Sequence, residues 1–128
     1  MLRWFLVLAA ALHLTFMVLE LFPWGFPFLL CRLATEKLGA DPFSHDQLCF
    51  VSTIVHNAGI YNGIVSGGLF WAAFHESTSI NIAHVMLIGA TVAGIFGAAT
   101  LSPLTGVQAV VGIIGLVLLR KSGQMQAA

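Results

Sequence analysis

The chain alternates long apolar segments with short polar breaks. A helix needs about 20 consecutive apolar residues to cross the hydrocarbon of a bilayer, and residues 48–74 form a run of about 27 residues without Asp, Glu, Lys or Arg. This pattern predicts an all-α protein, an integral membrane four-helix bundle, in which residues 1–128 form a single membrane-embedded domain. The predicted transmembrane helices cover about residues 4–22, 48–74, 80–101 and 104–119.

The longest connection lies between the first and second of these helices. The first apolar run ends near Pro23-Trp24-Gly25, and residues 26–46 follow before the second run begins. Apolar and charged side chains recur within this connection at helical spacing, which is typical of a short helix lying on the membrane surface. An irregular loop is the alternative. A short interfacial segment is therefore expected between helices one and two.

Composition supports a membrane protein. The sequence is 59% hydrophobic and 8% charged, with a mean hydropathy of +0.96, whereas soluble domains are about one-quarter charged. The net charge is zero, and no basic run indicates a nucleic-acid partner or a polybasic lipid-binding tail. Arg3 precedes an apolar run, as in a signal peptide, but residues 4–19 exceed the usual signal core of about 7–15 residues. We expect this run to remain as the first membrane helix.

Four crossings would place both termini on the same side of the lipid bilayer. Arg3, Arg120 and Lys121 lie on that side, and the long connection carries Arg32 and Lys37. Because cytoplasmic segments are enriched in Lys and Arg, both termini are predicted to be cytoplasmic.

This topology would place Cys31 and Cys49 toward the outer compartment. A disulfide can persist there. Two unpaired thiols are the alternative, because a sequence cannot show that two cysteines lie within bonding distance. Both possibilities stay open at this point.

Small residues recur about every four positions on three of the predicted helices. Gly59, Gly63 and Gly67 form one such series. Small side chains let membrane helices approach closely, which matters where no hydrophobic force drives helices together. We expect packing grooves within one bundle; an interface in a homo-oligomer is the alternative. The other series are Gly89, Ala93 and Gly97, flanked by Ala90, Gly94 and Ala98, and the pair Gly112 and Gly115.

Polar side chains within the first two helices are the candidate functional residues. Lipid offers such groups no hydrogen bonds, so they must face protein, water or a ligand. His13 and Glu20 share one face of their helix, because seven residues make nearly two turns. The two helices run antiparallel, which brings Glu20 and His56 to a similar depth. The predicted ligand-binding residues are His13, Glu20, His56, Asn57, Tyr61 and Asn62.

Glu20 and His56 are also the candidate catalytic residues. A carboxylate and an imidazole could meet directly or through one water and act as a proton-active or ligand-orienting pair. Alternatively, Glu20 could snorkel to the interface while His56 bonds to a neighbouring helix.

No metal and no cofactor are expected. No two histidines have the i, i+4 spacing of ligands on one helix, and no His-Glu-x-x-His pattern occurs. Axial haem ligation by His13 and His84 would require a common depth, but the two are offset by about one turn. His84 is instead expected to be a packed, hydrogen-bonded residue.

The first two helices resemble a bacterial membrane family called domain of unknown function thirteen-oh-four. The first match comprises Ala11-Leu12-His13, Phe16-Met17 and Leu19-Glu20-Leu21-Phe22, followed by Trp24. The second is Asn57 through Gly63, which follows the pattern N-x-G-x-Y-N-G. The family usually has Gln where this chain has Ala58, so one polar contact of a shared site is expected to be missing. The resemblance implies a four-helix protein of the bacterial inner membrane and no particular reaction.

Three functions are compatible with these features. The favoured one is a non-enzymatic membrane protein that binds or passes a small polar or amphipathic molecule. The second is a membrane enzyme acting on a lipid or isoprenoid-like substrate, with Glu20 and His56 as acid and base and Tyr61 orienting the substrate. The third is an accessory subunit of a larger membrane complex, to which the glycine series would dock.

Overall fold

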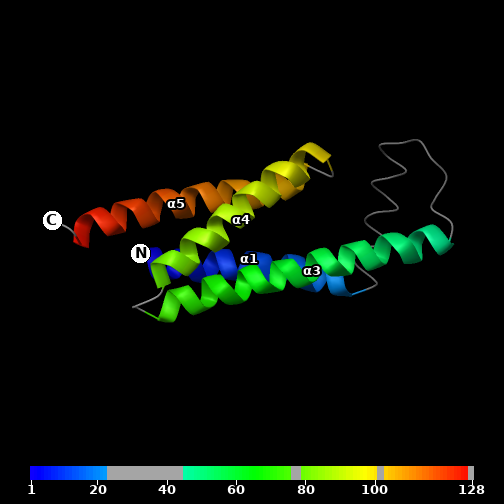
Figure 1. Cartoon of the computed structure of the whole chain (residues 1–128), viewed down its shortest axis with the longest axis horizontal. Helices are drawn as coiled ribbons and strands as arrows, with labels where there is room; N and C mark the ends of the chain where they lie inside the picture. The colour runs from blue at the N-terminus through cyan, green and yellow to red at the C-terminus, as the bar shows by residue number, and fades with distance from the viewer. Residues whose placement is uncertain (23–44, 76–78, 101–102, 127–128) are drawn as a thin grey trace. The chain divides into compact units, whose positions relative to one another are not determined.

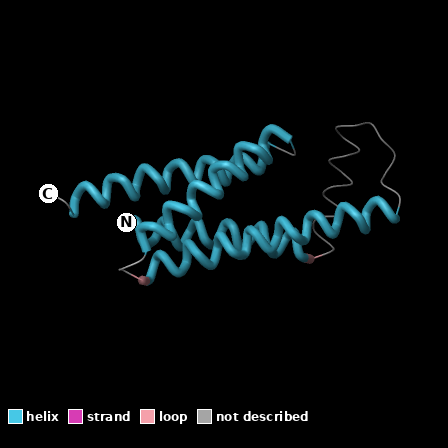
Figure 2. The backbone as a smooth tube through the Cα atoms, in the orientation of Figure 1, coloured by secondary structure: helices cyan, strands magenta, loops and turns pink. Residues whose placement is uncertain are grey.

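The computed structural model describes residues 1–22, 45–75, 79–100 and 103–126, and their regular structure is helical (Figure 2). The helices are α1 (Leu2–Leu21), α3 (His45–Phe74), α4 (Ser79–Thr100) and α5 (Gly106–Gln126), with a 3-10 turn, η1 (Pro103–Thr105), leading into α5. The predicted all-α class with four long helices is confirmed. The predicted interfacial segment and Cys31 lie outside the described residues, as does the side chain of Cys49.

Within the part of the chain that the structure describes, three segments are long and apolar enough to cross a membrane: Leu2–Leu21, Ile80–Thr100 and Pro103–Ser122. Over its described residues, α3 is not among them, and a fourth crossing by this helix stays a prediction. The outer surface of α4 is apolar, since Val85, Val92 and Phe96 are 64%, 62% and 68% exposed. Large apolar side chains outside and small ones between helices suit a lipid environment.

The chain divides into two compact units. Unit 1 consists of Met1–His13 and Ile64–Ala128, and unit 2 consists of Leu14–Gly63. The helices α4 and α5 belong entirely to unit 1, whereas α1 and α3 each contribute residues to both units. The organisation of residues 1–128 as a single domain stays a prediction.

Unit 1 is held together by a core to which all four helices contribute. Leu69 of α3 and Leu87 of α4 have no exposed surface. Within this unit the Ser66 hydroxyl donates a buried hydrogen bond of 2.8 Å to the Ala10 carbonyl of α1. The buried apolar residues are Leu6, Ala9, Ala10, Leu69, Ala72, Ala73, Ala83, Leu87 and Leu119.

The helices α4 and α5 lie side by side and antiparallel in unit 1 (Figure 1). A Cβ atom added to Gly94 would overlap the backbone of Ala109, and one added to Gly112 would lie 2.8 Å from the Leu87 carbonyl oxygen. These glycines therefore allow the two backbones to approach closely, and their predicted role in packing within the chain is confirmed. Gly67 and Gly89 also belong to the predicted series, but a Cβ atom at either position would have nothing within 4 Å, so the prediction that these two glycines pack against a helix is wrong.

The helix ends differ from the apolar runs that predicted them. The helix α3 begins at His45, and α5 continues to Gln126, beyond the predicted end at about 119. The apolar run stops before Arg120, but Arg, Lys and Gln are good helix formers and prolong the helix. The Ser122 hydroxyl also donates a hydrogen bond of 2.9 Å to the Leu119 carbonyl within this extension. Hydropathy thus marks the apolar segment and not the end of the helix.

Candidate functional site

Within unit 2, the last turns of α1 pack directly on a glycine face of α3. A Cβ atom added to Gly59 would lie 3.1 Å from both Glu20 Cβ and Leu21 Cγ. One added to Gly63 would lie 2.7 Å from the Met17 sulfur. A side chain at Gly59 would require its α1 neighbours to shift by a few tenths of an ångström, and one at Gly63 would displace the flexible Met17 side chain. The two glycines thus leave room for the close approach that brings Glu20 near α3.

Glu20 forms a hydrogen bond with α3. The Asn62 side-chain amide donates to Glu20 Oε2 over 2.8 Å. Glu20 is only 9% exposed, and Asn62 is half-buried. A buried carboxylate needs hydrogen-bond donors, because apolar surroundings replace none of the water it loses. The side chain is therefore directed to α3.

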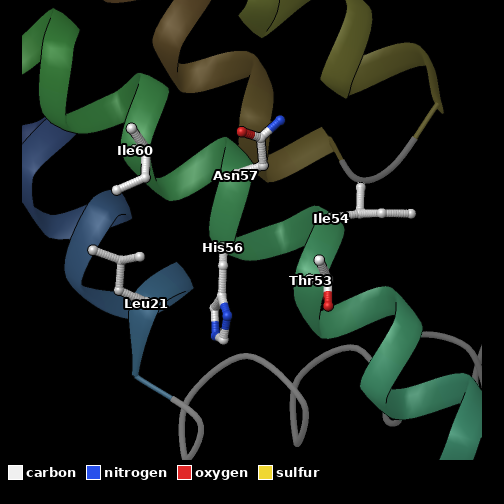
Figure 3. Close-up of a pocket in the computed structure, with 6 residues that line it drawn as sticks. All are labelled: Leu21, Thr53, Ile54, His56, Asn57 and Ile60. Carbon is white, nitrogen blue, oxygen red and sulfur yellow. The ribbon is translucent and has the colours of Figure 1, made fainter.

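A pocket of about 580 Å³ lies beside this pair in unit 2. Figure 3 shows His56 extending from α3 on the side of Leu21, whereas Asn57 extends to the other side of α3 in this view. Leu21 directly follows Glu20 and also contacts Gly59, so the same residue joins the pocket to the Glu20–Asn62 pair. The lining combines apolar walls with three polar side chains: Leu21, Thr53, Ile54, His56, Asn57 and Ile60.

The hydrogen-bond partner of Glu20 differs from the residue that the sequence suggested. His56 was the expected neighbour, but the hydrogen bond of Glu20 comes from Asn62. These two α3 residues are about 9 Å apart along the helix axis at 1.5 Å per residue. His56 is half-buried and lines the pocket, and the catalytic pairing of Glu20 with His56 stays a prediction.

The remaining predicted site residues lie in different surroundings. His13 belongs to unit 1 and is 1% exposed. Tyr61 is 63% exposed, and Asn57 is exposed although it lines the pocket. The structure thus joins Glu20 to Asn62 and places His56 and Asn57 around one pocket. The use of all six predicted residues for one ligand stays a prediction.

Sequence reasoning missed two buried polar residues of unit 1. Ser66 and Gln108 are 8% and 7% exposed. A signal for Ser66 was available, because it follows Gly59 by seven positions and so continues the face of α3 that carries small residues. Gln108 had no comparable signal: a single amide near the start of an apolar run does not reveal which way it faces.

His84, as expected, is hydrogen-bonded, with its Nδ1 atom 3.0 Å from the Ile80 carbonyl oxygen. Among the described residues, no group of three or more His, Cys, Asp or Glu could hold a metal ion.

Comparison with known proteins shows the family of the chain. Residues 7–120 match the family described as "Protein of unknown function (DUF1304)". The uncharacterized protein YpaA of Lactococcus lactis subsp. lactis (strain IL1403) is 36% identical over 50 residues, which cover 39% of this chain and 42% of that protein. The alignment therefore spans less than half of the relative. No solved structure matches the chain. The family match includes both Glu20 and Asn62 and extends through most of α5, and the chain belongs to the DUF1304 family.

Proposed function

We propose that this protein is a small integral protein of the bacterial inner membrane that binds or passes a small polar or amphipathic molecule at a site formed by α1 and α3. The hydrogen bond between Glu20 and Asn62 is the observation that carries this proposal. A carboxyl group on a membrane-spanning helix is unfavourable by about 2.5–3.5 kcal/mol at the bilayer centre, and residues of this kind commonly mark the path or site of a polar ligand.

The pocket beside the pair supports an amphipathic ligand. Leu21, Ile54 and Ile60 offer an apolar wall for a hydrocarbon portion. The polar groups of Thr53, His56 and Asn57 can orient a polar headgroup through hydrogen bonds. The ligand would sit with its apolar portion along the wall and its polar portion toward Glu20.

The proposed topology has four crossings with both termini in the cytoplasm. The helix α3 would form the fourth crossing, with Asn62 bonded to Glu20 and His56 lining the pocket. Arg3, Arg120 and Lys121 would lie on the cytoplasmic side, as expected from the enrichment of basic residues there.

Photolabelling tests the binding site. The purified protein in lipid nanodiscs would be exposed to an alkylamine carrying a diazirine, and labelled residues would be located by peptide mass spectrometry. The amine is chosen because a carboxylate accepts hydrogen bonds from it. We expect labelling to concentrate at Leu21 and at residues 53–60, above the level at Val92 and Phe96, which are exposed on α4.

Two controls separate site binding from partition into lipid. Glu20→Gln should reduce labelling at residues 53–60 roughly tenfold, as expected for the loss of a charge-assisted hydrogen bond. Glu76→Gln, the same chemical change at another position, should leave labelling by the amine probe unchanged. In the Glu20→Gln variant, an alcohol probe should label residues 53–60 to the same extent as the amine probe. Equal labelling of α3 and α4, or labelling of residues 53–60 that is insensitive to Glu20→Gln, would contradict the proposal.

A further inference from the structure

Basic and aromatic side chains from distant parts of the sequence meet at one end of unit 1. The guanidinium carbon of Arg3, at the start of α1, lies 4.3 Å from the centre of the Phe74 ring at the end of α3. The same carbon lies 5.9 Å from the Trp4 ring. Both distances are within the range of a cation–π interaction, so the two rings hold the Arg3 side chain at this end of the unit.

The end of α3 adds a second stacked pair. The rings of Trp71 and His75 lie 3.8 Å apart between centroids with an angle of 1° between their planes. Trp4, Trp71 and Phe74 are 67%, 52% and 43% exposed. An exposed group of Trp and Phe rings at the end of apolar helices is typical of the level of lipid headgroups.

The helix α5 brings two further cations to the same end. A Cβ atom added to Gly115 would lie 3.0 Å from the Phe5 ring, and Leu119 shares the core cluster with Leu6. Arg120 and Lys121 follow directly and are exposed. Figure 1 shows the first residues of α1 and the end of α5 on the same side of the picture. We call this group the basic–aromatic end; it comprises Arg3, Trp4, Trp71, Phe74, Arg120 and Lys121.

Among the described residues, the Asp, Glu, Lys and Arg side chains at this end are all basic, and the sequence adds one acidic residue, Glu76, directly after His75. The described residues of unit 1 include no Asp or Glu, whereas three of the five Lys and Arg residues of the chain belong to the basic–aromatic end. A guanidinium whose face rests on an aromatic ring still has N–H donors along its edge, and their geometry matches a phosphate group. The surface is therefore complementary to a phosphate carried at the depth of the aromatic rings.

We propose that the basic–aromatic end binds the headgroup of anionic phospholipids. This inference is independent of the site in unit 2. Each basic side chain near an anionic membrane surface increases binding by a factor of about five, and the rings fix the depth at which the cations meet the headgroups. No run of basic residues in the sequence indicates this surface, because the fold assembles it from α1, α3 and α5.

Fluorescence quenching by brominated lipids tests the proposal. A variant with Trp4→Phe and Trp24→Phe leaves Trp71 as the reporter, since the chain has three Trp residues. The protein would be placed in phosphatidylcholine vesicles containing increasing fractions of either phosphatidylglycerol or phosphatidylcholine brominated near the glycerol. We expect brominated phosphatidylglycerol to quench Trp71 at a mole fraction at least about fivefold lower than brominated phosphatidylcholine.

Charge variants show whether the basic–aromatic end causes the preference. Arg3→Gln combined with Arg120→Gln and Lys121→Gln should abolish it, while Arg3→Lys with Arg120→Lys should retain most of it. Arg32→Gln, which removes a charge from the connection between α1 and α3, should have no effect. Circular dichroism would confirm that each variant keeps its helices.

Two results would overturn the proposal. One is equal quenching of Trp71 by the two brominated lipids, which would also be the result if the surface binds an acidic protein instead. The other is an unchanged preference in the triple Gln variant, which would assign the lipid preference to another part of the chain.

Discussion

Glu20 depends on a single amide for the hydrogen bond that the structure shows. Its carboxylate is buried on a helix of mostly apolar residues and accepts from Asn62 over 2.8 Å. Removing the amide would leave the carboxylate buried without this donor. Replacing Glu20 by the neutral Gln at the same time would relieve part of the penalty. The two residues should therefore be energetically coupled.

A double-mutant cycle measures that coupling. Glu20→Gln, Asn62→Ala and the double variant would be compared by reversible unfolding in mixed detergent micelles. We expect a coupling free energy of about 1 kcal/mol, within the range found for hydrogen bonds between membrane helices. Asn57→Ala provides the matched control on the same helix, because Asn57 is exposed. Free energies of unfolding that simply add for Glu20 and Asn62 would show that the bond contributes nothing to stability.

The polar residues of this site could be chosen from the sequence, but not their pairing. Glu20, His56 and Asn62 were identifiable because polar groups on apolar helices need partners. Which pair meets depends on how far α1 slides along α3, and one turn of sliding is about 5.4 Å. That offset is set by the contacts of Gly59 and Gly63 with α1, which depend on both helices and cannot be read from either one.

At the scale of the element, α4 and α5 owe their close approach to glycines. The backbone of Ala109 occupies the space that a side chain at Gly94 would need. Backbone atoms cannot move aside as a flexible side chain can, so a methyl group at this position would separate the helices. Gly89 lies on the same helix and faces open space.

The two glycines provide a matched pair of substitutions on α4. Gly94→Ala should destabilise the protein by about 1–3 kcal/mol, the usual range for overpacking. Gly89→Ala should be neutral or stabilising by up to about 1 kcal/mol, because Ala favours the helix. Thermal unfolding in detergent, followed by circular dichroism, would compare them. Equal stability of the two variants would mean that α4 and α5 do not approach closely at Gly94.

The helices themselves were largely predictable, because long apolar runs and their breaks set the class and the approximate positions. The packing face was also predictable where glycines recur, as at Gly94 and Gly112. The end of α5 was not, since Arg120 and Lys121 end the apolar run without ending the helix. Contacts between side chains at helix ends, such as Arg3 with Phe74, involve residues 71 positions apart (74 − 3) and have no local signature.

At the scale of the whole molecule, the number of crossings decides which sides the termini face. Three segments of the described residues meet the length and hydropathy needed for crossing, and α3 would be the fourth. With four crossings the termini share one side, and with three they lie on opposite sides. The polar residues of α3 lower its mean hydropathy, and burial of those residues against protein would offset the cost of a crossing.

Cysteine labelling in spheroplasts distinguishes these topologies. Single cysteines would be inserted directly after Met1 or placed at Gln126 in a chain with Cys31→Ala and Cys49→Ala. A membrane-impermeant maleimide would be added before or after lysis. We expect both sites to react only after lysis, as four crossings with cytoplasmic termini require. Reaction of one terminus in intact spheroplasts would show that α3 does not cross.

The contact of α1 with α3 at Glu20 and Gly59 forms the proposed site, and disulfide formation measures this contact directly. A Cβ atom at Gly59 would lie 3.1 Å from Glu20 Cβ, close to the separation of about 3.5–4.5 Å found in disulfides. The native Cys31 and Cys49 would first be replaced. The pair Glu20→Cys with Gly59→Cys should then form a disulfide rapidly in native membranes under mild oxidation. Protection of the two new thiols from alkylation would report the disulfide. The pair Glu20→Cys with Asn57→Cys should react far more slowly. Equal rates for the two pairs, or no cross-link between positions 20 and 59, would contradict the site described here.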